Sequence, residues 1–274
     1  AADQPFTVAL ISAKKRSKKF SNKRKHRFKE YDHVEGRGMV SDKYRIYGAE
    51  MSPYSVKIRS YFRYKSIPHQ WLQRMQHDED FKKYARLPII PLVVTPEDEG
   101  IQDSTPIIEK LEKIYPDPSI HPEDPTLAFL SALIEEFGDE WGNKLLFHHR
   151  WYTERDQVAS AHILARDVMP DADADTIGGL AEKIRNRMSG RGAFVGSSAE
   201  TAPLISSYFD QLLEILEPHL ENRLYLFGDR PAFADFGLGL QLYEMALDPT
   251  TAAIIRARTP NVLKWVYRMT EPRN

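Results

Sequence analysis

The chain of 274 residues contains no cysteine. Disulfide bonds, thiolate metal ligands and a sulfur nucleophile carried by the protein itself are therefore excluded. Any thiol chemistry at this protein must use a thiol that a ligand supplies. The sequence also lacks an apolar run near the roughly 18 residues that span a bilayer, so we expect no transmembrane segment and a cytoplasmic location.

The formal net charge is only −1, but the charges are unevenly distributed. Residues 13–30 hold ten Lys or Arg and a single acid, Glu30, which leaves a net charge of −10 on the remaining chain. A block of like charges does not fold alone, so we expect residues 1–42 to form a basic arm that is flexible or ordered by a partner. The expected partner of this arm is an acidic protein or a larger assembly. Nucleic acid is not expected, because only Phe20 and Phe28 could stack on bases there.

From residue 43 onward, short β-like runs alternate with helical patterns, which is typical of an α/β domain. Pro53 suits the first turn of a helix, and Ile58, Tyr61 and Phe62 give that helix one apolar face. We expect strands at 44–47, 69–72, 91–95 and 100–102, with helices after 53, near 78–85 and after 104. This order predicts a thioredoxin-like domain over residues 43–117.

A proline-rich stretch, residues 116–125, follows this domain and marks a domain boundary, because four prolines in ten residues exclude a helix or a central strand. Beyond it the strand signals fade, and we expect an all-helical domain over residues 126–274. The run 236–247 is apolar nearly all round, so it should form the central buried helix. The expected helices are 126–149, 151–168, 174–189, 200–219, 235–247, 250–257 and 260–269.

Residues 44–55 are the most informative stretch, because a β-like run there breaks into the turn Ser-Pro-Tyr-Ser and a helix follows. The start of a helix presents free backbone N–H groups, and with a hydroxyl beside them it suits an anion. A ligand thiolate is one such anion, and Ser52 is the candidate hydroxyl. The alternatives are that Ser52 is a plain helix cap, or that Tyr47 or Tyr54 is the donor.

Four local motifs, in this order along the chain, resemble those of the soluble glutathione transferases. Ser52-Pro53-Tyr54-Ser55 occupies the place of the family's Cys-Pro-x-Cys or Ser-Pro-x-Ser. Ile90-Pro91 resembles its cis-proline, and Asp103-Ser104 matches its acidic-Ser pair. Residues 226–235 are similar to the segment before its central helix, with Ala232 where the family usually has a Ser or Thr cap. The resemblance covers nearly everything outside the basic arm, and it implies the two-domain fold of that family and a homodimer.

The resemblance also implies that glutathione binds as a co-substrate and that Ser52 donates a hydrogen bond to its thiolate. Ser104 would hold the γ-glutamyl carboxylate, Asp103 would meet the ammonium group, and the Ile90 backbone would pair with the cysteinyl unit. Simple helix capping is the alternative for Asp103 and Ser104. The residues expected at the glutathione site are Tyr54, Ser55, Ile90, Pro91, Asp103 and Ser104.

Reduction of mixed disulfides needs an enzyme thiolate, so the expected reaction is attack of glutathione on a small hydrophobic electrophile. An acceptor pocket is expected between the domains, lined by Trp141, His148 and Tyr152. No metal site is expected, because adjacent His148 and His149 point about 100° apart on a helix. The alternative function is a catalytically inactive binding or scaffold protein of the same fold, which docks to a larger assembly through the basic arm.

Overall fold

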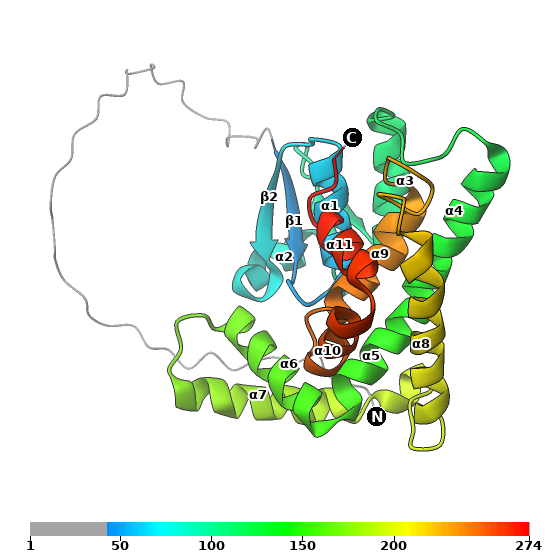
Figure 1. The fold of residues 1–274 in the computed structure, drawn as a ribbon. Helices are drawn as coiled ribbons and strands as arrows, with labels where there is room; N and C mark the ends of the chain where they lie inside the picture. The colour runs from blue at the N-terminus through cyan, green and yellow to red at the C-terminus, as the bar shows by residue number, and fades with distance from the viewer. Residues whose placement is uncertain (1–42, 274) are drawn as a thin grey trace, which may run out of the picture. The chain divides into compact units, whose positions relative to one another are not determined.

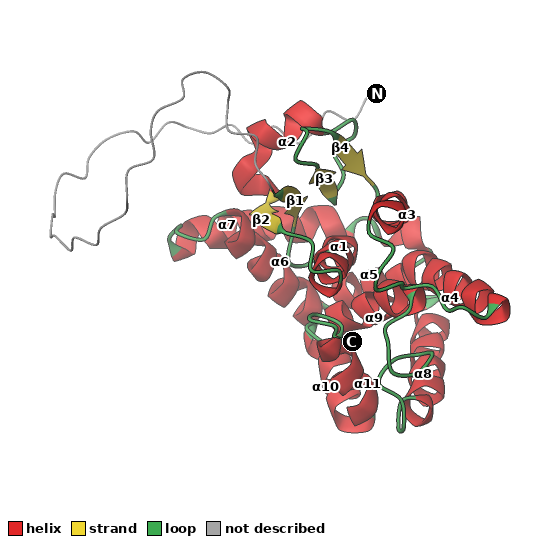
Figure 2. Ribbon diagram, turned by 90° about the horizontal axis from the view of Figure 1, so that it is seen from above, coloured by secondary structure: helices red, strands yellow, loops and turns green. Residues whose placement is uncertain are grey.

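The computed structural model describes residues 43–273. The basic arm expected over residues 1–42 lies outside them. The described residues form an α/β domain followed by an all-helical domain (Figures 1 and 2), which confirms the predicted architecture.

A four-stranded mixed sheet organises the N-terminal domain, with strands β1 (Tyr44–Gly48), β2 (His69–Gln73), β3 (Leu92–Val94) and β4 (Gly100–Gln102). The strand order is β2-β1-β3-β4. β1 runs parallel to β2 and antiparallel to β3, and β3 pairs antiparallel with β4. This is the predicted thioredoxin-like sheet, with the hairpin of the third and fourth strands in its expected place.

Helices cover both faces of the sheet. Helices α1 (Pro53–Tyr64) and α3 (Ser104–Ile114) pack against the face that carries Ile46 and Val93. Helix α2 (Asp78–Tyr84), which follows the short helix η1 (Arg74–His77), contributes Phe81 to the other face. Alternate residues of β1 and β3 thus enter different cores, as the side-chain alternation of a strand requires.

The C-terminal domain consists of helices joined by short segments. Residues 116–124 before it contain no helix or strand, whereas Pro125, the last residue of the predicted boundary stretch, is the first residue of a helix. Across residues 43–273, no helix has both the length and the apolar composition needed to cross a membrane. The helices of this domain are α4 (Pro125–Phe137), η2 (Gly138–Gly142, a π-helix), α5 (Asn143–Tyr152), α6 (Glu154–Val168), α7 (Ala174–Ser189), η3 (Gly192–Val195), α8 (Ala202–His219), α9 (Phe233–Met245), α10 (Pro249–Arg258) and α11 (Pro260–Arg268).

The first predicted break between helices was misplaced. Instead of ending at 149, the first helix continues through η2 and α5 to Tyr152. The chain leaves the helix at Thr153, whose extended backbone and side-chain oxygen cap α6 by accepting from the Asp156 amide at 3.3 Å. A Thr or Ser cap of this kind fixes a helix start more strongly than the hydrophobic pattern does.

The central helix of the domain is α9, as predicted, and nearly all of its residues are buried. Its N-cap is Ala232, which offers no side-chain acceptor. The buried Asp235 carboxylate accepts from the amides of Ala232 and Leu226 at 2.8 and 2.9 Å and from Trp265 Nε1 at 2.8 Å. Three donors on one carboxylate tie the start of α9 to α11, so the missing cap hydroxyl leaves the helix intact.

The two domains share a continuous core in which α1 packs against α9. The rings of Tyr61 and Tyr64 both lie 5.9 Å from the ring of Phe236. Close by, the Ser60 hydroxyl donates to the backbone oxygen of Met269 at the end of α11. The C-terminal half of α1 is therefore held in place by the helical domain as well as by the sheet.

Candidate functional site

Ser52 follows the turn after β1 and is the N-cap residue of α1. Its half-buried hydroxyl oxygen accepts from the Ser55 amide at 3.3 Å and from the Ser55 hydroxyl at 3.0 Å. Within residues 43–273 no acceptor for the Ser52 hydroxyl hydrogen is found. The oxygen is thus oriented by Ser55, while its hydrogen can still be donated to a ligand.

The two tyrosines considered as alternative donors both have other partners. Tyr47 is fully buried and donates to the Asp80 carboxylate, and burial raises the pKa of Tyr47. Tyr54 donates to the backbone oxygen of Asp139 at 2.7 Å and accepts from Asn143 Nδ2 at 2.6 Å. These contacts favour a core-packing role for Tyr47. They also favour a role for Tyr54 in attaching the start of α1 to η2.

The peptide bond between Ile90 and Pro91 is cis, as the sequence motif predicted. Pro91 is buried immediately before β3, and Ile90 is half-buried. The loop before it is fixed by the Gln102 side chain, which accepts from the amides of Arg86 and Leu87 and donates to the backbone oxygens of Leu87 and Ile89 at 2.7–3.0 Å. This anchoring role of Gln102, the residue before the Asp103-Ser104 motif, was not predicted from the sequence.

The Asp103-Ser104 pair stands at the start of α3. Asp103 is exposed, makes no side-chain cap hydrogen bond and has a φ of 76°, which is rare for a residue other than glycine. Such backbone strain concentrates at functional sites. Ser104 is only 1% exposed, and its hydroxyl donates to Asp139 Oδ2 at 3.4 Å. Among the described residues, the Asp103 side chain therefore does not cap α3.

Lys57, on α1, is a buried cation next to Asp139 that the sequence analysis did not single out. Its ammonium is 1% exposed and contacts the Glu135 carboxylate, Asp139 Oδ2 at 2.7 Å and the Thr105 hydroxyl at 3.5 Å. Burial raises the pKa of Glu135, and the neighbouring Lys57 opposes this rise. Glu135 and Asp139 thus act as partners of a buried lysine, and no group of His, Asp or Glu suited to a metal ion is found within residues 43–273.

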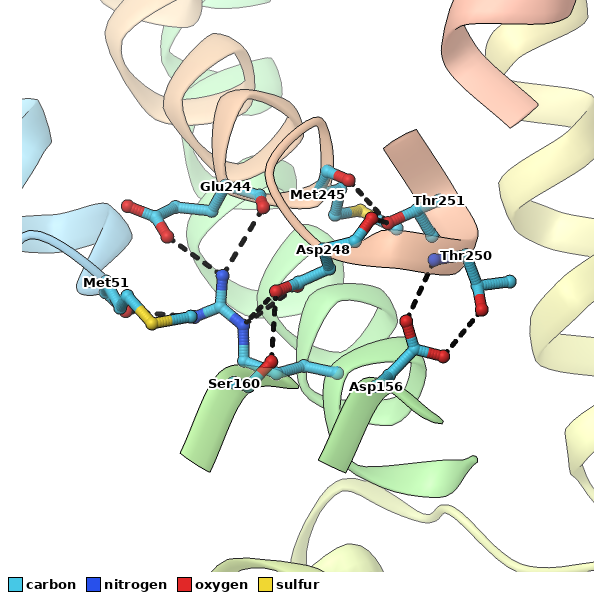
Figure 3. A network of polar contacts seen from close by, with 9 residues as sticks. Met51, Asp156, Ser160, Glu244, Met245, Asp248, Thr250 and Thr251 are labelled. Carbon is cyan, nitrogen blue, oxygen red and sulfur yellow. Dashed lines mark hydrogen bonds and ion pairs between the residues drawn. The ribbon is translucent and has the colours of Figure 1, made fainter. Parts of the chain in front are cut away.

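Arg150, on α5, forms a second buried network with Met51, Glu244 and Asp248, the partners labelled in Figure 3. Arg150 Nε donates to the Asp248 carboxylate at 2.8 and 3.0 Å, and Nη2 donates to Glu244 at 2.8 Å. Its Nη1 donates to the backbone oxygen of Met51 at 2.9 Å. The guanidinium therefore fixes the peptide group next to Ser52 from within the helical domain.

The three residues expected at the acceptor pocket do not form one site. Trp141 is 53% exposed, and Lys144 Nζ lies 4.6 Å from the centre of its ring. The rings of His148 and Tyr152 stack at 4.6 Å and line a cavity of about 230 Å³. No residue of the thioredoxin-like domain lines this cavity, so the structure does not bring His148 and Tyr152 together with Ser52.

His149, beside them, should make stability depend on pH. Burial lowers the pKa of His149 from 6.5 to about 4. The unfolded chain therefore binds a proton below pH 6.5, whereas the folded chain binds it only below about pH 4. We expect the free energy of unfolding to fall as the pH drops through this window, by up to about 1.4 kcal/mol per pH unit.

Denaturant unfolding of wild type and His149→Phe at several pH values between 4 and 6.5 checks this expectation. Carboxylates contribute their own pH dependence to both proteins, so the difference between the two slopes isolates His149. The slope should be smaller in His149→Phe, and equal slopes would show that His149 titrates normally in the folded protein.

Comparisons with known proteins agree with the fold described above. Residues 46–119 match the sequence model of the glutathione S-transferase N-terminal domain. No curated protein matches the chain. Among solved structures, a glutathione S-transferase from Rhodospirillum rubrum F11 has a TM-score of 0.53 at 19% identity, and the match covers 81% of this chain and 86% of that one.

Two further structures share the fold over most of the chain. The β-etherase LigF from Sphingobium sp. strain SYK-6 has a TM-score of 0.57 at 16% identity, and the match covers 83% of this chain and 94% of that one. A glutathione S-transferase from Methylobacillus flagellatus KT with glutathione bound has a TM-score of 0.50 at 18% identity, with coverages of 84% and 95%. At these identities the structural likeness shows the fold alone. The family model matches residues 46–119, the thioredoxin-like domain, and the solved structures share the fold of both domains.

Proposed function

We propose that this chain is a glutathione transferase that activates bound glutathione, its co-substrate, as a thiolate for attack on a small hydrophobic electrophile. The observation that carries the proposal is the Ser52 hydroxyl at the first turn of α1, whose oxygen accepts from Ser55 while its hydrogen has no acceptor within residues 43–273. Glutathione bound to the relative from Methylobacillus flagellatus KT supports the choice of co-substrate. We place the reaction in the cytoplasm, where the glutathione pool is kept reduced.

The energy required of this site is modest. A free thiol with a pKa near 8.5 is only about 3% thiolate at pH 7, and lowering that pKa by two units takes roughly 2.7 kcal/mol. A hydrogen bond to a charged group contributes about 1.5–3 kcal/mol, and a helix N-terminus about 0.3–1 kcal/mol. A Ser52 hydrogen bond and the start of α1 can together supply the whole shift.

The remaining contacts of glutathione follow from the same geometry. We assign the backbone of Ile90, which precedes β3, to the cysteinyl unit, and the start of α3 at Ser104 suits the γ-glutamyl carboxylate. Exposed Asp103 is available for the ammonium group. Ser55 orients the Ser52 hydroxyl, and Tyr54 borders the site.

In the reaction the thiol proton passes to solvent, and the sulfur lone pair forms a bond to an electrophilic carbon. The displaced group then leaves with its bonding electrons, or an activated double bond takes the electron pair and is protonated. We propose that the electrophile approaches from the helical domain, with Trp141 near its path. The cavity of His148 and Tyr152 lies outside this route.

Conjugation kinetics with glutathione and a chromogenic nitroaryl halide test the proposal. In Ser52→Ala we expect kcat/KM to fall roughly 10- to 100-fold, because one hydrogen bond to the developing thiolate is lost. The conservative variant Ser52→Thr, which keeps a hydroxyl, should retain most of the activity. Equal activity of wild type and Ser52→Ala would exclude Ser52 as the activating group.

A second candidate is a protein of this fold without turnover that docks to a larger assembly through the basic arm. The observation in its favour is that a plain helix cap would make the same two hydrogen bonds that Ser52 accepts. This candidate predicts no conjugation by the wild type above the uncatalysed rate, whether or not the protein is retained on a glutathione column.

We also propose that the protein is a homodimer that associates through α4. This helix exposes a row of large apolar side chains, with Phe129 67% and Leu133 53% exposed. Exposed apolar surface of this extent on one helix marks an interaction site. The other exposed members of the row are Leu127, Leu130 and Phe137.

The variant Phe129→Glu/Leu133→Glu should therefore be monomeric in light scattering coupled to size exclusion, because two carboxylates would be buried in the interface. The matched control Ile215→Glu, at an apolar position of α8 that is 68% exposed, should remain dimeric. A monomeric wild type, or a dimeric double variant, would contradict the assignment of this surface.

A further inference from the structure

The backbone on both sides of Ser52 is held by hydrogen bonds. The Ser52 amide donates to the Ala49 backbone oxygen at 3.2 Å, and the Ser52 carbonyl accepts from the Val56 amide at 3.0 Å. The carbonyl of the preceding residue, Met51, accepts from Arg150 Nη1 at 2.9 Å. Within the part of the chain that the structure describes, only this last bond reaches the backbone of Met51 or Ser52 from outside the turn and the first turn of α1.

These bonds fix the direction of the Ser52 side chain. The peptide group between Met51 and Ser52 is held at its carbonyl by Arg150 and at its N–H by Ala49. A peptide group is planar, so a group held at both edges resists rotation about the two flanking bonds, and the φ of Ser52 stays near −112°. The Cα–Cβ bond of Ser52 follows the backbone. The Arg150 contact therefore also fixes the point from which the hydroxyl is donated.

Arg150 itself has little freedom to move. Its Nε donates to both oxygens of the Asp248 carboxylate, and its Nη2 donates to the carboxylate and the backbone oxygen of Glu244 at 2.8 and 3.3 Å. Asp248 in turn accepts from the Ser160 hydroxyl on α6 at 3.3 Å. All three guanidinium nitrogens are thus engaged, and the planar fork presents Nη1 to Met51 in a fixed direction. The position of the turn therefore depends on the helical domain.

We propose that Arg150 is a positioning residue for thiolate activation, which acts through the peptide group between Met51 and Ser52 on the direction of the Ser52 hydroxyl. This inference rests on the proposed function. A hydrogen bond weakens steeply when its donor is misdirected, so a turn without the Arg150 contact should stabilise the thiolate less. The helical domain then contributes to glutathione activation as well as the thioredoxin-like domain.

Titration of the thiolate absorbance of bound glutathione tests this role in the full-chain variant Arg150→Met/Glu244→Leu/Asp248→Asn. The second and third substitutions remove the carboxylates that Arg150→Met alone would leave unpaired, so this variant should fold. We expect the bound-thiol pKa to rise by about one unit above the wild-type value, which is tenfold less thiolate stabilisation. A purely electrostatic effect would lower this pKa, because the variant loses two carboxylates and one cation.

The same three substitutions in the Ser52→Ala background show whether Arg150 acts through Ser52. Without the hydroxyl its direction no longer matters, so the bound-thiol pKa should be the same with and without the three substitutions. Arg150→Lys is a second variant, which keeps a cation beside the carboxylates but ends a bond short of Nη1, and it should raise the pKa in the same direction. An equal rise with and without the Ser52 hydroxyl, or no rise in either Arg150 variant, would overturn the proposal.

The matched control is Leu213→Ala, at a buried position of α8 outside the Arg150 network, which lowers stability by removing apolar atoms. Its bound-thiol pKa should equal that of wild type.

Amide hydrogen exchange without glutathione separates this proposal from the proposed function. The Ser52 amide should exchange at least about tenfold faster in the Arg150 variants than in Leu213→Ala, because the turn opens more easily. Equal exchange of this amide in the variants and the control would overturn the positioning role alone. An unshifted thiol pKa in wild type would instead overturn the proposed function and, with it, the effect of Arg150 on the thiolate.

Discussion

Replacing Arg150 with methionine should lower the free energy of unfolding by about 3–5 kcal/mol. Arg150 is 5% exposed, and the carboxylates of Glu244 and Asp248 that pair with it are fully buried. Removal of one partner from a buried ion pair leaves an uncompensated charge in a low-dielectric interior, which costs this much. Denaturant unfolding measures the loss as a shift of the midpoint at unchanged slope.

The matched control is Arg258→Met, which breaks a half-exposed ion pair with Asp210 and should cost less than about 1 kcal/mol. Adding Glu244→Leu and Asp248→Asn to Arg150→Met should recover part of the stability, because the unpaired carboxylates are then removed. If Arg150→Met cost no more than the control, the network would have no role in holding the turn at Met51.

Lys57→Met should also lower the free energy of unfolding by about 3–5 kcal/mol at pH 7. The variant leaves the buried Glu135 carboxylate beside the half-buried Asp139 carboxylate without their ammonium partner. Burial already raises the pKa of Glu135, and loss of Lys57 should raise it further. The folded variant then binds more protons than the unfolded chain above pH 4.5, so its stability falls as the pH rises.

Unfolding of wild type and Lys57→Met at pH 5 and pH 7 checks both parts of this prediction. The difference between the two proteins should be smaller at pH 5, where Glu135 of the variant is more often protonated. Adding Glu135→Gln should reduce both the loss and its pH dependence. A loss of the same size at both pH values would show that Lys57 stabilises through packing and not through charge.

Much of the fold could be predicted because its signals are local. Ser52 and Pro53 are residues preferred at the N-cap and first position of a helix, and Ile90-Pro91 stood in a recognisable motif. The apolar run that became α9 marked the central helix by composition alone. The Thr153 cap is an equally local signal, but the sequence analysis did not use it and placed the break between residues 149 and 151.

The charged networks could not be predicted, because their partners are distant in the sequence. Lys57 lies two positions before Arg59 on a helix. A lysine in a helix usually faces solvent. Its partners are 78 and 82 residues away, and those of Arg150 are 94 and 98 residues away. Glu135 and Asp139 are four residues apart in the sequence, and only the contact of α1 with α4 and η2 reveals the cation between them.

The location of His148 and Tyr152 depends on the same kind of long-range information. Their aromatic and polar character suggested a substrate pocket, and they do line a cavity. The rotation of α5 that directs Arg150 toward Met51 also directs these two residues toward α8 and α10. The phase of a helix relative to its neighbours is set by packing, which the sequence pattern of a mostly buried helix does not specify.

The measurement that tests the central claim most directly is a pH titration of the ultraviolet thiolate absorbance of glutathione bound to wild type, Ser52→Ala and Ser52→Thr. We predict a bound-thiol pKa about two units below the free value near 8.5 in wild type and in Ser52→Thr, and a return toward 8.5 by at least about one unit in Ser52→Ala. The same pKa in wild type and Ser52→Ala, or an unshifted pKa in wild type, would contradict the claim.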